Sequence, residues 1–276
     1  MENTELVLLN NYEMKQVREI KQWKKEEPGV VSMIMGKVVA PFNWVLDKMV
    51  PTAAIEAALN ISNIMARLLA DKKDIVRDSG LKNVWELRNK DLELSDKLAN
   101  DVHNWAIGMA ATEGGITGAI GLPGIVADIP GIITLALRTI HKIGLCYGYG
   151  MKSEEDRQFV YGIMAVGGAN SIEEKTAALA LLSQVEANIA GQTLKKMAGV
   201  AASKKAGSEA ITSSVRSLAK QLGINLTERK GLQAIPAIGA AIGSSVNAWY
   251  IKEVGWAARR AFQERWMIDN RKISEI

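Results

Sequence analysis

Glycine is concentrated in one apolar stretch of this chain, residues 105–150. From Trp105 to Leu137 the only charged residues are Glu113 and Asp128. Each glycine inside a helix costs about 1 kcal/mol relative to alanine, so a series of them needs a packing reason. Glycines three or four residues apart leave a strip of bare backbone on which another helix can pack closely. The stretch therefore predicts a central helical hairpin at residues 105–150.

The same reasoning assigns structural roles along the hairpin. We expect Leu122-Pro123-Gly124 to turn the chain, and Asp128 to cap the second helix with Pro130 in its first turn. A second charge-free segment, residues 232–251, is also rich in glycine. We expect the two glycine faces to pack against each other. The packing residues are Gly114, Gly115, Gly118, Gly121, Pro123, Gly124, Pro130, Gly239 and Gly243.

The remaining segments also show helical spacing and no sustained alternation of period two. The predicted fold class is all-α: a single multi-helix bundle in which residues 1–276 form one domain with a central glycine-rich helical hairpin. An amphipathic helix is expected within residues 1–28, ending at Pro28-Gly29. The other expected helices cover residues 30–49, 52–70 and 252–276. The expected N-caps are Ser95, Ser153 and Ser171.

The composition says more about the cellular compartment of the protein than about its chemistry. The single cysteine, Cys146, excludes an internal disulfide and is expected to be a buried thiol. The N-terminus lacks the basic start and apolar run of a signal peptide, which predicts a cytoplasmic protein or one peripheral to the inner membrane. Trp105 and the pair Tyr147 and Tyr149 flank the hairpin, as aromatic residues do at membrane interfaces. A compact bundle and a surface-bound or partly inserted protein both remain open.

Four residues are candidates for chemistry. They are Glu113, Asp128, His103 and His141. In a closed hairpin His103 and His141 could approach each other, with Asp101 or Glu113 nearby. Glu113 has no capping role, and a carboxyl among apolar residues has a raised pKa, so it is the best catalytic candidate. These residues support a peptidase-like hydrolase as one hypothesis. No metal-binding or cofactor motif is present, so neither is expected.

A basic segment follows residue 195. Its lysines fit an anionic membrane surface or a membrane-protein partner. Aromatic residues are not interleaved with them, which argues against nucleic acid as the partner. The residues proposed to contact an anionic surface are Lys195, Lys196, Lys204 and Lys205. The oligomeric state does not follow from the sequence.

Several motifs in combination resemble the EcsC family. They are TEGGITG at residues 112–118, GLPGIVADIP at 121–130, LRTI at 137–140, YGYG at 147–150 and IPAIG at 235–239. The resemblance extends from about Tyr12 to Trp266. EcsC-like proteins are bacterial, and the founding member is encoded beside the ATPase and membrane subunits of an ABC-type exporter. The resemblance implies a setting beside a transport or envelope system more than a mechanism, with Glu113 and Asp128 as part of the family pattern. Our first hypothesis is a non-enzymatic accessory protein that works in that setting.

Overall fold

The structure is a computed structural model, and its described residues form eight helices and no strand. The all-α prediction is confirmed at this level. The described residues are 7–28, 59, 66, 70–118, 122–197, 213, 217, 220, 221, 225 and 236–274, with the backbone alone at 113–118, 122–129, 191–197 and 236–245. None of the helices in these ranges is both long enough and apolar enough to cross a bilayer.

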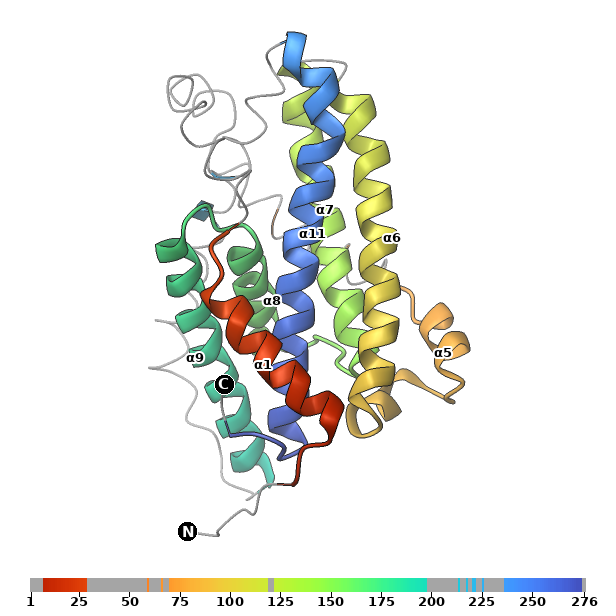
Figure 1. Cartoon of the computed structure of the whole chain (residues 1–276), viewed down its shortest axis with the longest axis vertical. Coiled ribbons are helices and arrows are strands. Elements are labelled where there is room, and N and C mark those ends of the chain that lie inside the picture. The colour runs from red at the N-terminus through yellow and green to blue at the C-terminus, as the bar shows by residue number, and fades with distance from the viewer. Residues whose placement is uncertain are drawn as a thin grey trace.

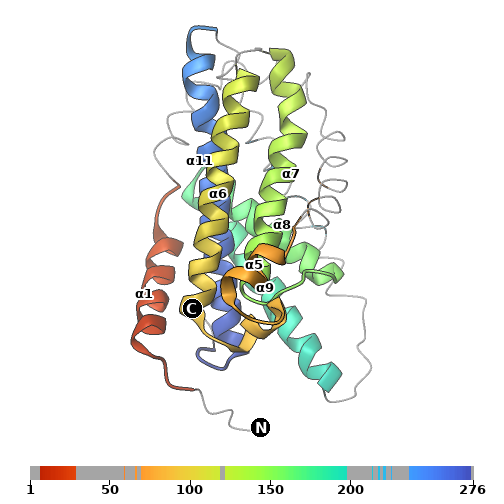
Figure 2. The ribbon, with the colours of Figure 1, turned by 90° about the vertical axis from the view of Figure 1, so that its right-hand side faces the viewer.

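Three long helices form the centre of the molecule: α6 (Leu92–Gly118), α7 (Leu122–Cys146) and α11 (Pro236–Asp269). Figures 1 and 2 show α7 and α11 both running antiparallel to α6. Helix α11 packs most extensively against α6 and also contacts α7. The end of α6 and the starts of α7 and α11 lie at the same end of the bundle, which extends past the shorter helices (Figure 1).

The other helices surround the lower half of these three (Figures 1 and 2). Helices α8 (Glu154–Gly167) and α9 (Ile172–Met197) pack against each other, and α8 also packs on α11. Helix α1 (Asn11–Lys25) lies across α11 and α9. The short helix α5 (Lys73–Ser79) contacts α6, and the 3-10 helix η2 (Val84–Asn89) contacts α7.

An aromatic cluster joins these helices in the core. Phe262 of α11 stacks on Tyr147 and Tyr149 at ring-centroid distances of 6.0 and 5.7 Å, and it meets Phe159 of α8 edge-on at 5.3 Å. Tyr147 and Tyr149 are buried. A membrane-interface position, which the sequence left open for these two tyrosines, is therefore excluded. They are core residues that pack on Phe262 of α11.

Two predicted N-caps are confirmed. The Ser153 hydroxyl accepts from the Asp156 N–H at 3.1 Å and the Asp156 carboxylate accepts from the Ser153 N–H at 3.1 Å, which is a capping box at α8. The Ser171 hydroxyl accepts from the Glu174 N–H at 3.2 Å at the start of α9. These caps are predictable because every partner lies within four residues.

The prediction for Ser95 is wrong. Helix α6 starts earlier, at Leu92, because the Asp91 carboxylate accepts from the Leu94 N–H at 3.2 Å and caps it there. Ser95 lies inside α6 and is fully buried. Helix α1 begins at Asn11, because Asn10 forms a capping box with Glu13. Residues 7–10 before it are not helical.

The expected turn at Leu122-Pro123-Gly124 is also misplaced. These residues are already helical at the start of α7, and proline suits the first turn because its missing N–H would have no partner there. Asp128 and Pro130 then lie within α7 and not at its start, so the predicted cap at Asp128 is wrong. Gly121 lies outside the described residues, and the other packing glycines of α6, α7 and α11 are described by their backbone alone. The glycine-lined contact with α11 therefore stays a prediction.

The last helix is longer than the sequence indicated. Residues 236–269 form one helix, α11, where a boundary was expected between residues 251 and 252. The charge pattern changes there, but no proline or cap interrupts the backbone. Helix α9 likewise continues through Gly191 without a break. The predicted helix at residues 30–49 lies outside the described residues, as does most of that at 52–70.

Candidate functional site

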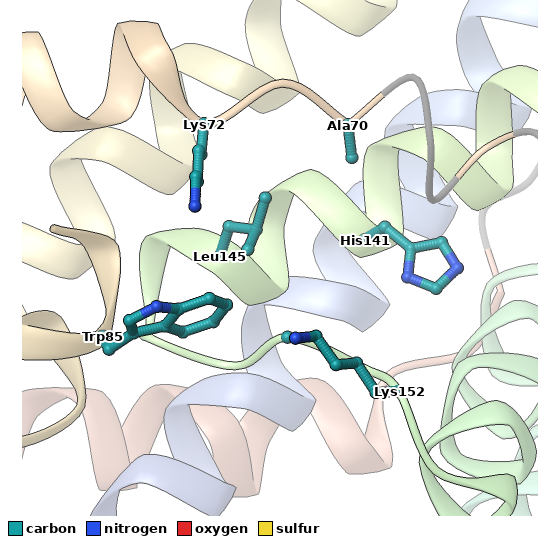
Figure 3. A pocket seen from close by; sticks show the side chains of 7 residues that line it. Ala70, Lys72, Trp85, His141, Leu145 and Lys152 are labelled. Atoms are coloured by element: carbon teal, nitrogen blue, oxygen red, sulfur yellow. The ribbon is translucent and has the colours of Figure 1, made fainter.

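A pocket of about 510 Å³ opens beside the C-terminal end of α7 (Figure 3). Its walls come from four parts of the chain: the segment before α5, the helix η2, the last turns of α7, and the connection from α7 to α8. The lining residues are Ala70, Lys72, Trp85, His141, Leu145, Gly150 and Lys152. Only tertiary packing brings these segments together.

Trp85 forms one side of the pocket. The Asn83 side chain accepts from the Trp85 N–H at 3.0 Å, which caps η2 and holds the tryptophan in its first turn. The indole lies against the backbone of Gly150, where an added Cβ would be only 2.9 Å from the ring. Trp85 nevertheless remains 42% exposed. The indole is therefore held in place and still accessible to a ligand.

A glycine turn brings the α7–α8 connection to this position. Gly148 has φ +79°, a conformation that favours glycine, and a Cβ there would lie 2.5 Å from the backbone nitrogen of Arg88. The turn thus lets the chain reverse directly against η2. As a consequence, Lys152 reaches the same pocket as Trp85.

Two lysines extend toward Trp85 from different sides of the pocket (Figure 3). The Nζ atoms of Lys72 and Lys152 lie 5.6 and 5.7 Å from the centre of the Trp85 ring. None of the described lining residues carries a carboxylate. Nearby, Lys142 forms an ion pair with Asp74, so that charge is already compensated. The described part of the pocket wall therefore carries a net positive charge.

This arrangement suits an anion with an apolar part. An exposed cation–π contact contributes only about 0.5–1 kcal/mol, so it holds each lysine weakly and leaves it available. Lysine ammonium groups bind phosphate and carboxylate oxygens as flexible point charges. Trp85 and Leu145 offer apolar surface for the rest of the ligand. The described lining residues lack a nucleophile paired with a base.

The predicted site residues His103 and His141 lie in different surroundings. His141 is buried in the wall of the pocket. His103 of α6 faces α11, where its Nε2 lies 3.0 Å from the Lys252 carbonyl oxygen and its ring meets Trp256 edge-on. Burial and then the charge of Arg259 lower the pKa of His103 to about 4. His103 is therefore a neutral packing residue at neutral pH.

The acidic candidates remain predictions. Glu113 lies in α6 and Asp128 in α7, and their side chains are outside the described part of the structure. Lys195 and Lys196 lie near the end of α9, likewise with the backbone alone described, and Lys204 and Lys205 lie outside the described residues. The hydrolase hypothesis gains no support from the residues that are described.

Cys146 is a buried thiol, as predicted. Its Sγ donates to the Lys142 carbonyl oxygen at 3.3 Å, and burial raises the pKa of the thiol well above its ordinary value. Within the described ranges no group of three or more histidine, cysteine, aspartate or glutamate side chains could hold a metal ion.

A buried polar network was not found from the sequence. The Asp96 carboxylate accepts hydrogen bonds from the hydroxyls of Tyr12 and Tyr147 and, at 2.7 Å, from Gln263 Nε2. These partners join α1, α6 and α11 to the residue that follows α7. Burial raises the pKa of Asp96 above its ordinary value. Because three donors occupy this carboxylate, we assign it a structural role.

Comparison with known proteins gives a family match over most of the chain. The model for the EcsC protein family matches residues 14–267. The "Uncharacterized protein YdbA" of Bacillus subtilis (strain 168) is 21% identical over 275 residues, which cover 94% of this chain and 94% of YdbA. No solved structure matches this chain.

Proposed function

The chain belongs to the EcsC protein family, and from that premise we propose that it is a non-enzymatic accessory protein that binds an anionic group in the pocket around Trp85. In this proposal the protein works in the cytoplasm or at the inner face of a bacterial membrane, beside a transport or envelope system. The ligand carries a phosphate group, either in solution or as a lipid headgroup, attached to an apolar body.

One observation carries the proposal: Lys72 and Lys152 both extend toward Trp85, and none of the described residues that line the pocket carries a carboxylate. Two ammonium groups facing the same space repel each other, and an anion between them removes that repulsion. The exposed indole ring and Leu145 then contact the apolar part of the ligand.

The test compares two sources of a phosphate group attached to an apolar body: a small molecule in solution and a lipid headgroup. The full-length protein is titrated with phenyl phosphate in solution and, separately, with vesicles of phosphatidylglycerol or phosphatidylcholine. Binding to phenyl phosphate supports a soluble anion, and binding only to phosphatidylglycerol vesicles supports a lipid headgroup. Absence of binding in both arms would overturn the proposal.

The double variant Lys72→Gln/Lys152→Gln removes both positive charges that extend toward Trp85. Each lysine near an anionic surface contributes about 1 kcal/mol, so losing both weakens binding by roughly thirtyfold. Lys82→Gln/Lys90→Gln is the control, because both lysines are exposed, lie outside the pocket lining and change the net charge equally. Equal losses in the two variants would mean that the pocket is not the site.

A further inference from the structure

A second pocket, of about 160 Å³, lies between α9 and the C-terminal part of α11. Ser183, Glu186 and Ala187 line it from α9, and Arg265 and Asp269 line it from α11. None of these residues lines the pocket around Trp85. The two pockets are therefore independent.

Glu186 has an unusual position in this second pocket. Its Oε1 atom is buried and has no hydrogen-bond partner among the described residues. A buried carboxyl oxygen without a donor is unfavourable, and such groups are rare in folded proteins unless a ligand or water completes them. The pocket supplies the space for a missing donor.

The nearby cations already have carboxylate partners. Lys24 pairs with Glu264 at 2.9 Å, Arg265 with Asp156 at 3.3 Å, and Arg88 with Asp269 at 2.9 Å. Among the residues that the structure describes, Glu186 has no such partner. Burial and then the charge of Glu264 raise the pKa of Glu186 to about 8, with Asp269 adding to this and with Lys24 and Arg265 opposing it. Glu186 is therefore mostly protonated at neutral pH in the free protein.

We propose that this pocket binds a small organic cation, whose ammonium group donates to Glu186 Oε1 and is balanced by the Glu186 carboxylate. The alkyl part of the ligand lies against Ala187 and the other apolar residues of the wall. Binding of the ammonium ion favours the carboxylate form of Glu186, so the carboxyl proton is released to solvent as the complex forms.

The test uses n-butylammonium chloride as the probe and n-butanol as its uncharged analogue. Binding to the full-length protein is followed by amide chemical shifts in α9. We expect butylammonium to bind at least about tenfold more tightly than butanol, because only the ion gains a charge-assisted hydrogen bond. We also expect its affinity to rise by up to about tenfold per pH unit between roughly pH 6 and 8.

Variants test whether Glu186 is the group that binds the ammonium ion. Glu186→Gln is expected to abolish the rise with pH and to weaken butylammonium binding by about tenfold or more. Glu173→Gln is the control, since Glu173 is exposed on the same helix. Ala187→Leu narrows the pocket without touching Glu186 and is expected to block binding even if Glu186→Gln were to unfold. Equal binding of butanol, a flat pH profile, or no binding of butylammonium would overturn the proposal.

Discussion

His103 of α6 occupies the space directly over Gly255 of α11. A Cβ built on Gly255 would lie 2.1 Å from the His103 Cδ2 atom and 2.2 Å from its Nε2. The ring has little room to move, because it bonds to the Lys252 carbonyl and packs on Trp256. This close approach joins the two helices that form the most extensive contact in the described structure.

Gly255→Ala is therefore expected to destabilise the protein. Overpacking a core contact costs about 1–3 kcal/mol, and this contact is too short to be relieved by a small shift. The gain in helix propensity, about 1 kcal/mol, offsets only part of that cost. Urea unfolding measures the net loss, which we expect to be up to about 2 kcal/mol.

Gly108→Ala is the matched control on α6. An added Cβ at Gly108 meets nothing within 4 Å, so the same substitution should stabilise the protein by up to about 1 kcal/mol. Equal effects of the two substitutions would contradict the packing of His103 against α11.

His103 should also make stability depend on pH. The folded protein keeps His103 neutral down to about pH 4, whereas the ordinary pKa is 6.5. Between these values the unfolded chain binds the proton more readily, so stability is lost as the pH falls from 6.5 toward 4. The full effect is about 3 kcal/mol.

This loss is measured by urea unfolding at several pH values for the wild type and for His103→Gln. The variant cannot titrate at this position, so its stability should fall less on acidification. Comparing the two proteins cancels the other titrating groups. Parallel pH profiles would show that His103 is not held neutral.

Asp96 is expected to be among the most sensitive polar positions. Asp96→Ala leaves the buried Tyr147 hydroxyl without its acceptor, and removes the acceptor of Tyr12 and Gln263 as well. Each unsatisfied buried donor costs about 1–3 kcal/mol, so we expect a loss of roughly 3 kcal/mol or more. Asp101→Ala, at an exposed position on the same helix, should change stability little.

Cell fractionation tests the membrane part of the proposed function. At low salt, part of the expressed protein should be recovered with the membranes. A salt wash should release it, because about 1 M salt shortens the Debye length to roughly 3 Å. Complete recovery without membranes at low salt, together with no binding to anionic vesicles, would contradict this expectation.

Variants in the same fractionation separate the two basic regions. If the pocket around Trp85 binds the membrane, Lys72→Gln/Lys152→Gln should reduce recovery with the membranes. If the segment after α9 does so, Lys195→Gln/Lys196→Gln should have the larger effect. Lys82→Gln/Lys90→Gln is again the control for net charge.

Local features of the fold were predictable from the sequence, because their partners are close in the chain. The Ser153 and Ser171 caps, the end of α1 before Pro28 and the helical spacing each depend on residues a few positions apart. Predictions failed where two local signals competed. Asp91 and Ser95 are both good N-caps, and the earlier one starts the helix.

The burial of polar and charged side chains was decided only by tertiary structure. Residues 252–269 alternate charge with apolar residues, as an amphipathic helix does, yet Arg260, Gln263 and Glu264 are buried. Their partners lie on other helices: Gln16, Asp96 and Lys24. A sequence pattern distinguishes polar from apolar residues, but it does not show which polar residues will find a partner.

The family and the all-α class followed from the sequence by itself, since both depend on motifs and periodicity that a linear chain already contains. The candidate pocket could not be predicted from the sequence. Lys72, Trp85 and Lys152 share no motif and lie far apart in the chain, and they meet because the turn at Gly148 returns the chain against η2. The raised pKa of Glu186 has the same origin, since burial and neighbouring charges exist only after the helices have packed.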